Sequence, residues 1–319
     1  MTAFENNFKT LLKLYRSGMT KAQRTRTRHR RPRAPTYPIV IEREYAKYIS
    51  NTIKRTADSA IELLRPFLMK YTPAHTDSID SELDDIMSRL EEELGVIYGT
   101  NALSSGMLFR TLEQIAEQIL GKNSAFMQSE IKIISGHEMQ LDYSWWPETK
   151  ALWEQENYKL ITGLNEEYIK KLNSVVINGV QNGTPFDELV NQIKAVNTNM
   201  SDARARLIAR DQTGKLQGLI SKAQQTSIGM TTYFWENRGD RKVRGNPIGI
   251  YPKAESHWEI GGMLCAWENP TVYSDDLGVT WKKRPNRWVQ MHPGMAIQDR
   301  CTAAASWNSY LRDIDRGLA

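Results

Sequence analysis

Two histidines and two cysteines in the C-terminal part of the sequence are of the types that bind zinc. They are His257, Cys265, His292 and Cys301. Two imidazoles and two thiolates suit a tetrahedral zinc ion, but zinc fingers and knuckles take their ligands in closely spaced pairs. Neither histidine has such a partner a few residues away. We therefore expect these side chains to pack and to form hydrogen bonds, and we expect no metal and no cofactor.

Motifs of the common enzyme classes are missing from the sequence. It contains no phosphate-binding loop, no Gly-x-Ser-x-Gly turn and no His-Glu-x-x-His pair. Ser256 precedes His257, but the sequence indicates no acidic partner for them. We therefore predict no catalytic residues and a protein that is not an enzyme. A toxin-like transferase or hydrolase in the C-terminal region is the alternative.

Basic side chains are dense near the N-terminus. Residues 1–40 hold ten Lys and Arg against Glu5 alone, a formal charge of +9, whereas positions 41–319 carry −4. Arginine pairs well with phosphate, and such contacts release counterions from DNA. The residues that we expect to bind nucleic acid are Lys21, Arg24, Arg26, Arg28, Arg30, Arg31 and Arg33.

We predict that residues 1–40 form a basic flexible arm, because like charges repel and prolines interrupt helices. Within the arm, apolar residues recur at helical spacing from Phe4 to Tyr15 and predict a short amphipathic helix that ends before Gly18. A solubilising tail is one alternative use of the arm. Contact of the helix over residues 3–17 with a membrane surface is another.

The middle of the chain is expected to be helical. Apolar residues recur at helical spacing over residues 39–69, 78–98, 102–134 and 153–180. Thr184 and Ser201 are expected to cap the starts of two further helices. We divide this part of the chain into a helical region over 41–142 and a second helical segment over 143–228.

The periodicity changes after Gly229, where glycine and proline recur every few residues. Short strands are expected near 231–236, 272–273 and 279–282. We therefore predict a small, loop-rich β domain over 229–319. The fold class is α+β, with a mostly helical N-terminal two-thirds followed by this β domain.

The expected helix that starts at Ser201 carries charged residues in front of a glycine pair. Asp211 follows Arg210, and we expect it to join this helix to the β domain through a buried ion pair or hydrogen bond. A catalytic carboxylate is the alternative. Gly214 and Gly218 lie four residues apart on one helix face, so another segment can approach closely there.

Four segments in order resemble a known family. They are the charged helix over 201–216, the run Thr231–Trp235, the segment Asp240–Arg244 and the closing segment His292–Cys301. Over about residues 160–305 they resemble the Mu F-like minor head protein family of tailed phages, also described as phage head morphogenesis proteins. The residues to which the resemblance gives a structural role are Arg206, Arg210, Asp211, Asp240, Arg244, His292 and Cys301.

Two positions depart from the family pattern. Asp299 replaces the first cysteine of the terminal Cys-x-Cys pair, and Cys301 keeps the second. Asn246 and Pro247 stand where the family often has a histidine. These departures weaken the expectation of a metal or redox role at this end of the domain.

The resemblance implies a minor head protein that acts in head morphogenesis in the interior of the virion head, and in the host cytoplasm during assembly. The implied partners are the portal protein and the major capsid or scaffold protein, with DNA contacted through the basic arm. The arm could instead dock on an acidic portal or capsid surface. The alternative function is a free nucleic-acid-binding or regulatory protein.

Composition sets broader bounds. Hydrophobic residues make up 40% and charged residues 25% of the 319 positions, as in an ordinary folded protein. No run approaches the roughly 18 apolar residues of a membrane span, so we expect none. Two cysteines give no disulfide framework, which favours a reducing cytoplasm. Tryptophans concentrated in the C-terminal half form a core, a protein interface or a base-stacking surface.

Overall fold

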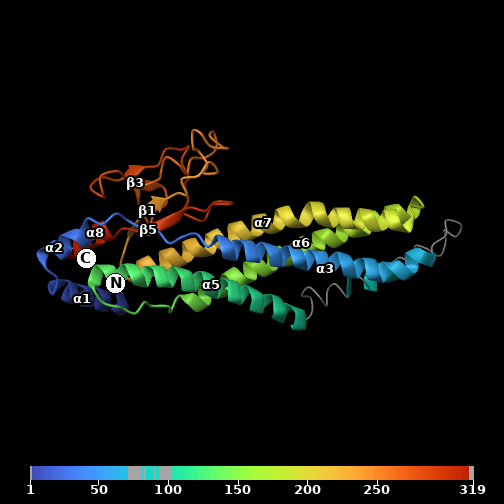
Figure 1. Cartoon of the computed structure of the whole chain (residues 1–319), viewed down its shortest axis with the longest axis horizontal. Helices are drawn as coiled ribbons and strands as arrows, with labels where there is room; N and C mark the ends of the chain where they lie inside the picture. The colour runs from blue at the N-terminus through green and yellow to red at the C-terminus, as the bar shows by residue number, and fades with distance from the viewer. Residues whose placement is uncertain (1, 71–80, 82–83, 90, 93–101, 316–319) are drawn as a thin grey trace. The chain divides into compact units, whose positions relative to one another are not determined.

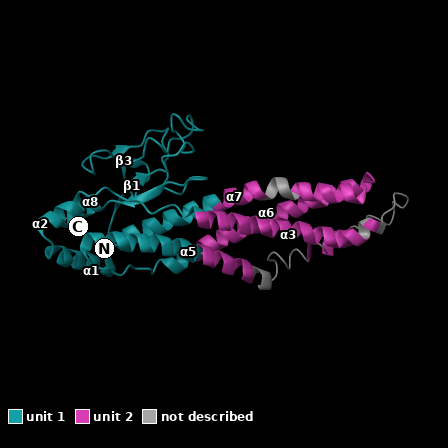
Figure 2. Ribbon diagram, viewed as in Figure 1, with its two compact units in different colours: residues 1–39, 116–150, 210–319 teal, residues 40–115, 151–209 magenta. Residues whose placement is uncertain are grey.

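The computed structural model describes residues 2–70, 81, 84–89, 91–92 and 102–315 of the chain. Most of the helix expected over 78–98 lies outside these residues. The chain forms two compact units, each built from segments that are far apart in the sequence (Figure 2). The first unit comprises residues 1–39, 116–150 and 210–319, and the second comprises 40–115 and 151–209.

These units differ from the four segments predicted from the sequence. Three long helices contribute residues to both units: α5 (Ala102–Ser135), α6 (Trp146–Gln181) and α7 (Phe186–Ser227). Apolar periodicity reveals where a helix runs but not which part of it joins which core. The two helices expected to start near Thr184 and at Ser201 are one helix, because no glycine or proline interrupts α7 between Phe186 and Arg210.

The second unit is helical in its described residues. Helix α3 (Ile39–Lys70) buries the expected stripe, which includes Ile49, Ile53 and Leu64. A buried hydrogen bond from Tyr45 Oη to Asn157 Oδ1, at 2.5 Å, joins α3 to α6. Buried polar pairs must be satisfied, so this contact fixes how the two helices align along their length.

In the first unit, helix α1 (Ala3–Ser17) confirms the amphipathic helix predicted before Gly18. Its N-cap, Thr2, accepts a hydrogen bond from the backbone of Glu5 at 3.1 Å. The buried Phe8 and Leu12 belong to a core cluster with residues of α5 and of helix α8 (Trp307–Asp315). The N-terminal helix is therefore part of the folded unit.

The arm predicted to be flexible contains a second helix, α2 (Lys21–Arg28), so that prediction is wrong for these residues. Thr20 and Gln23 form a capping box that satisfies the first free backbone amides. The expected repulsion between the basic side chains is offset by ion pairs with acidic residues that are remote in the sequence. Arg30 donates to Glu130 at 3.0 and 3.1 Å, and Arg16 pairs with Asp315 at 3.4 Å.

The C-terminal part of the first unit contains a five-stranded antiparallel sheet with the order β4-β3-β2-β1-β5. Figure 1 labels β1, β3 and β5 of this sheet. The strands are β1 (Thr232–Glu236), β2 (Leu264–Ala266), β3 (Val272–Ser274), β4 (Lys282–Lys283) and β5 (Thr302–Ala305). The predicted α+β class is confirmed. Strands β2 and β5 were not predicted, because Leu-Cys-Ala in β2 and the three alanines of β5 lack the β-branched and aromatic residues that indicate a strand.

Strand β1, which lies between β2 and β5, presents Tyr233 and Trp235 to one face of the sheet. Both are fully buried in a cluster that also contains Trp267, Trp288 and Cys301. The tryptophans near the sheet thus supply the core of a domain that has little regular secondary structure.

Helix α7 contacts the loop that precedes β5 through backbone atoms. A methyl group on Gly214 would lie 2.5 Å from the carbonyl oxygen of Asp299, and one on Gly218 would collide with the carbonyl oxygen of Pro293. Gly294 has a φ of +83° and faces Gly214 in the same contact. The close approach predicted from the glycine pair is confirmed.

Among the helices in the described ranges, none is both long enough and apolar enough to cross a membrane.

Replacing Gly214 or Gly218 with Ala should destabilise the first unit, because the added methyl group meets backbone that cannot rotate away. We expect a loss of about 1–3 kcal/mol in the free energy of unfolding, measured by urea denaturation followed by tryptophan fluorescence. Gly121→Ala is the control. Gly121 lies exposed in α5 with open space around it, so alanine should stabilise by about 0.5–1 kcal/mol. Equal effects at all three positions would contradict the close contact.

Candidate functional site: a basic pocket beside a buried His-Asp-Cys cluster

A pocket of about 460 Å³ lies in the first unit, between the start of its α7 segment, the loop after β1 and the loop before β5. Five cationic side chains line it, and the one lining carboxylate, Asp299, is buried. An excess of positive charge in a concave site favours the binding of anions. The lining cations are Arg210, Arg238, Lys242, Arg244 and Arg300.

The segment Asp240–Arg244 forms one wall through a compact turn. Asp240 Oδ1 accepts from the backbone of Lys242 at 2.9 Å, and its Oδ2 pairs with Arg300 at 3.1 Å. The carbonyl oxygen of Arg244 accepts from the backbone amides of His257 and Trp258 at 3.0 and 3.1 Å. Asp240 and Arg244 therefore position the chain around the pocket.

The opposite wall is a strained turn at Gln298, which has a φ of +57°. Its backbone amide donates to Asp211 Oδ1 at 3.3 Å, and its side chain accepts from Arg210 at 3.1 Å. Asp211 also pairs with Lys215 at 3.1 Å. A hydrogen bond thus joins this helix to the β domain as expected, but it is exposed and not buried. It holds the turn that leads into Asp299.

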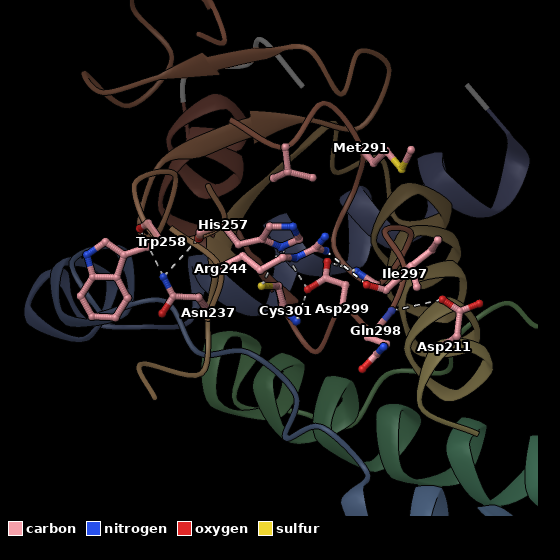
Figure 3. Close-up of polar contacts among 12 residues, drawn as sticks. Asp211, Asn237, Arg244, His257, Trp258, Met291, Ile297, Gln298, Asp299 and Cys301 are labelled. Atoms are coloured by element: carbon pink, nitrogen blue, oxygen red, sulfur yellow. Dashed lines mark hydrogen bonds and ion pairs between the residues drawn. The ribbon is translucent and has the colours of Figure 1, made fainter. Parts of the chain in front are cut away.

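Three buried side chains meet at the base of the pocket, where Figure 3 shows His257, Asp299 and Cys301 directed toward one another. The Nδ1 atom of His257 lies 3.2 Å from Asp299 Oδ1 and 3.6 Å from Cys301 Sγ. The backbone amides of Gly294 and Cys301 donate to the Asp299 carboxylate at 3.0 and 2.9 Å. Asp299 is the acidic partner of His257 that the sequence did not indicate.

Burial by itself would raise the pKa of Asp299, but hydrogen bonds from His257 and Cys301 outweigh it, so this pKa is lowered. Burial and the neighbouring Asp299 charge raise the pKa of Cys301 well above its usual value. In a nucleophilic triad, the nucleophile and the acid contact different nitrogens of the histidine. Here both groups face Nδ1, so the arrangement is not that of a catalytic triad.

The four residues considered as a zinc set do not come together. His292 Nδ1 lies 3.1 Å from Tyr233 Oη, and Cys265 Sγ lies 3.8 Å from the carbonyl oxygen of Met263. Within the described residues, His257 and Cys301 of that set are grouped with Asp299 instead. Sequence spacing missed this group because loop packing, and not a short motif, assembles it.

A buried arginine was also missed. Arg284 donates to the carbonyl oxygens of Val289 and Met291 at 2.8 and 3.0 Å, and to Tyr233 Oη at 3.3 Å. Its guanidinium lies over the Trp235 ring at 5.4 Å. In the sequence it follows two lysines of an exposed strand, so nothing distinguishes it from a surface cation.

The residues predicted to bind nucleic acid divide into two groups. Arg28 and Arg30 are partly buried and pair with Asp315 at 3.8 Å and Glu130 at 3.0 Å. The other residues of the group are exposed, although Arg33 also approaches Glu130 at 3.7 Å. They are Lys21, Arg24, Arg26, Arg31 and Arg33. Arg206 lies in the second unit and pairs with Asp202 at 4.0 Å.

Comparison with known proteins gives a family match for part of the chain. Residues 170–304 match the family described as Phage Mu protein F like protein, which confirms the resemblance over this segment. An uncharacterized protein of Haemophilus influenzae is 30% identical over 173 residues, which cover 51% of this chain and 36% of that protein. No solved structure matches the chain. The family supports a role in phage head morphogenesis.

His292 should make stability depend on pH. Its burial, and then the charges of Lys222 and Arg284, lower its pKa from 6.5 to about 4. Between these values the unfolded chain gains a proton that the folded chain does not, so stability falls as the pH decreases from 6.5 to 4. We measure the urea concentration at which half of the protein is unfolded. In His292→Gln this concentration should lack the part of the decrease between pH 6.5 and 4 that His292 causes. His29→Gln, which changes an exposed histidine, should keep it; identical profiles for all three proteins would contradict the assignment.

Proposed function

We propose, from the membership of residues 170–304 in the Mu F-like family, that this protein is a minor component of a tailed-phage head and acts in head morphogenesis. The family match carries the proposal. The arrangement of the matched residues supports a structural role, because Asp211, Asp240 and Arg244 hold loops in place. We propose the head interior as its place in the virion, after synthesis in the host cytoplasm.

The proposed protein partners are the portal protein and the major capsid or scaffold protein. The loop after β1 supports a protein contact because it exposes three large apolar side chains. Ile248 is 77% exposed, Ile250 54% and Tyr251 55%. Neighbouring exposed apolar residues are typical of interaction surfaces.

Mass spectrometry of purified proheads and mature particles tests the virion role by measuring the ratio of this chain to the portal protein. A low, reproducible ratio in proheads is the expected result. Absence from both particles would contradict the proposal and would favour a free nucleic-acid-binding protein. The N-terminal peptides should be quantified separately, because their loss on maturation would reveal processing within the basic segment.

We also propose that the basic segment over residues 21–33 contacts packaged DNA. The observation that supports this is the exposure of Lys21, Arg24, Arg26 and Arg31 along α2 and the chain that follows it. No carboxylate pairs with these four side chains among the ion pairs of the described residues. They can therefore approach phosphates without first breaking an ion pair.

The test replaces Lys21, Arg24, Arg26 and Arg31 with Ala and measures affinity for duplex DNA against salt concentration. The slope of log K against log salt is negative, and each lost phosphate contact makes it about 0.9 less negative. The steepness should therefore decrease by as much as about 3.6. The charge-matched control replaces four exposed cations of the second unit: Lys47, Arg55, Lys159 and Lys170.

The control separates local contacts from overall charge. If both variants changed the slope equally, only net charge would matter and the segment would have no special role. An unchanged slope in the first variant would also contradict DNA contact, and retained binding to portal or capsid protein would then assign the segment to a protein surface.

A further inference from the structure

We propose that His257, Asp299 and Cys301 bind one zinc ion through Nδ1, Oδ1 and Sγ. These three side chains come from two loops of the first unit and are buried, with 2%, 3% and 7% of their surface exposed. Their ligand atoms all lie within 4.8 Å of one another. An imidazole, a carboxylate and a thiolate are the ligand types that zinc takes in proteins.

The distances between the ligand atoms fit a tetrahedral ion. With zinc bonds of about 2.05 Å to nitrogen, 2.1 Å to oxygen and 2.3 Å to sulfur, nitrogen and oxygen lie about 3.4 Å apart, and nitrogen and sulfur about 3.6 Å apart. The corresponding distances from His257 Nδ1 are 3.2 Å to Asp299 and 3.6 Å to Cys301. One ion between the three atoms therefore requires little movement of the side chains.

Hydrogen bonding alone leaves this cluster poorly satisfied. The Nδ1 atom of His257 carries at most one proton, yet a carboxylate and a sulfur both face it. A divalent cation would bind the carboxylate and the sulfur at once, and it would stabilise the thiolate that burial otherwise disfavours.

The surrounding contacts hold the ligands in place. The Asp299 carboxylate accepts from the amides of Gly294 and Cys301, while the His257 amide donates to the Arg244 carbonyl oxygen. The rings of Trp235 and His257 pack edge to face, with 5.8 Å between their centroids. Ligands that are oriented before the metal arrives bind it more tightly.

All three residues border the basic pocket, so the fourth ligand would come from that side. Zinc with one carboxylate and one thiolate has no net charge, and the cations around the pocket would then favour an anion as the fourth ligand. Water or the oxygen of a bound anion meets this requirement. The site is therefore an open three-residue zinc site.

The experiment measures zinc in the full chain, purified without chelator and then dialysed against a limited excess of zinc. Elemental mass spectrometry should find one zinc per chain, and Cys301→Ser and His257→Gln should each lose it. Cys265→Ser is the matched control, because Cys265 is also a buried thiol but lies on β2 outside the cluster. It should keep the full zinc content.

Two further measurements keep the test decisive if a variant unfolds. Cobalt added to the unmodified chain should give a thiolate-to-cobalt charge-transfer band, which requires no mutation. Asp299→Cys should bind zinc more tightly than the unmodified chain in competition with a chromophoric chelator, because a second thiolate is a softer ligand than a carboxylate. Absence of both zinc and the cobalt band from the unmodified chain would overturn the proposal. Zinc retained by folded Cys301→Ser would overturn it as well.

Discussion

The fold of the first unit depends on direct backbone contact between α7 and the loop before β5. Gly214 and Gly218 give the helix a face without side chains, and the carbonyl oxygens of Asp299 and Pro293 lie against it. Gly294 completes the contact with a positive φ that other residues rarely adopt. No side chain can adjust at such a contact, so the position of the helix determines the position of the loop. Every group that the loop carries into the pocket is placed by this constraint.

The polar interior of the unit follows from that placement. Asp299 reaches His257 because Asp211 on α7 holds the amide of the preceding residue, Gln298. On the same face of β1, the buried guanidinium of Arg284 satisfies carbonyl oxygens and the Tyr233 hydroxyl. Short strands give this domain few ladder hydrogen bonds, and these side-chain contacts supply the links between loops that longer strands would otherwise provide.

Positive charge serves two physical purposes in the first unit. Part of the N-terminal basic segment stabilises the fold, since Arg30 and Arg16 pair with Glu130 and Asp315. The exposed cations of the same segment, and those around the pocket, carry charge that these ion pairs do not neutralise. The paired cations order the chain, and the exposed cations are the ones that the proposed contact with DNA would use.

The sequence by itself determined the features that depend on neighbouring residues. Helix α1, the buried stripe of α3, strand β1, the glycine pair of α7 and the resemblance to the Mu F-like family all follow from periodicity, local turn chemistry or residue order. Strands β2 and β5 did not, because they contain few β-branched or aromatic residues. The order of the basic segment and the His257–Asp299–Cys301 group were decided by the tertiary structure alone. Their partners are remote in the chain, and the free energy of a buried charge depends on what packing brings next to it.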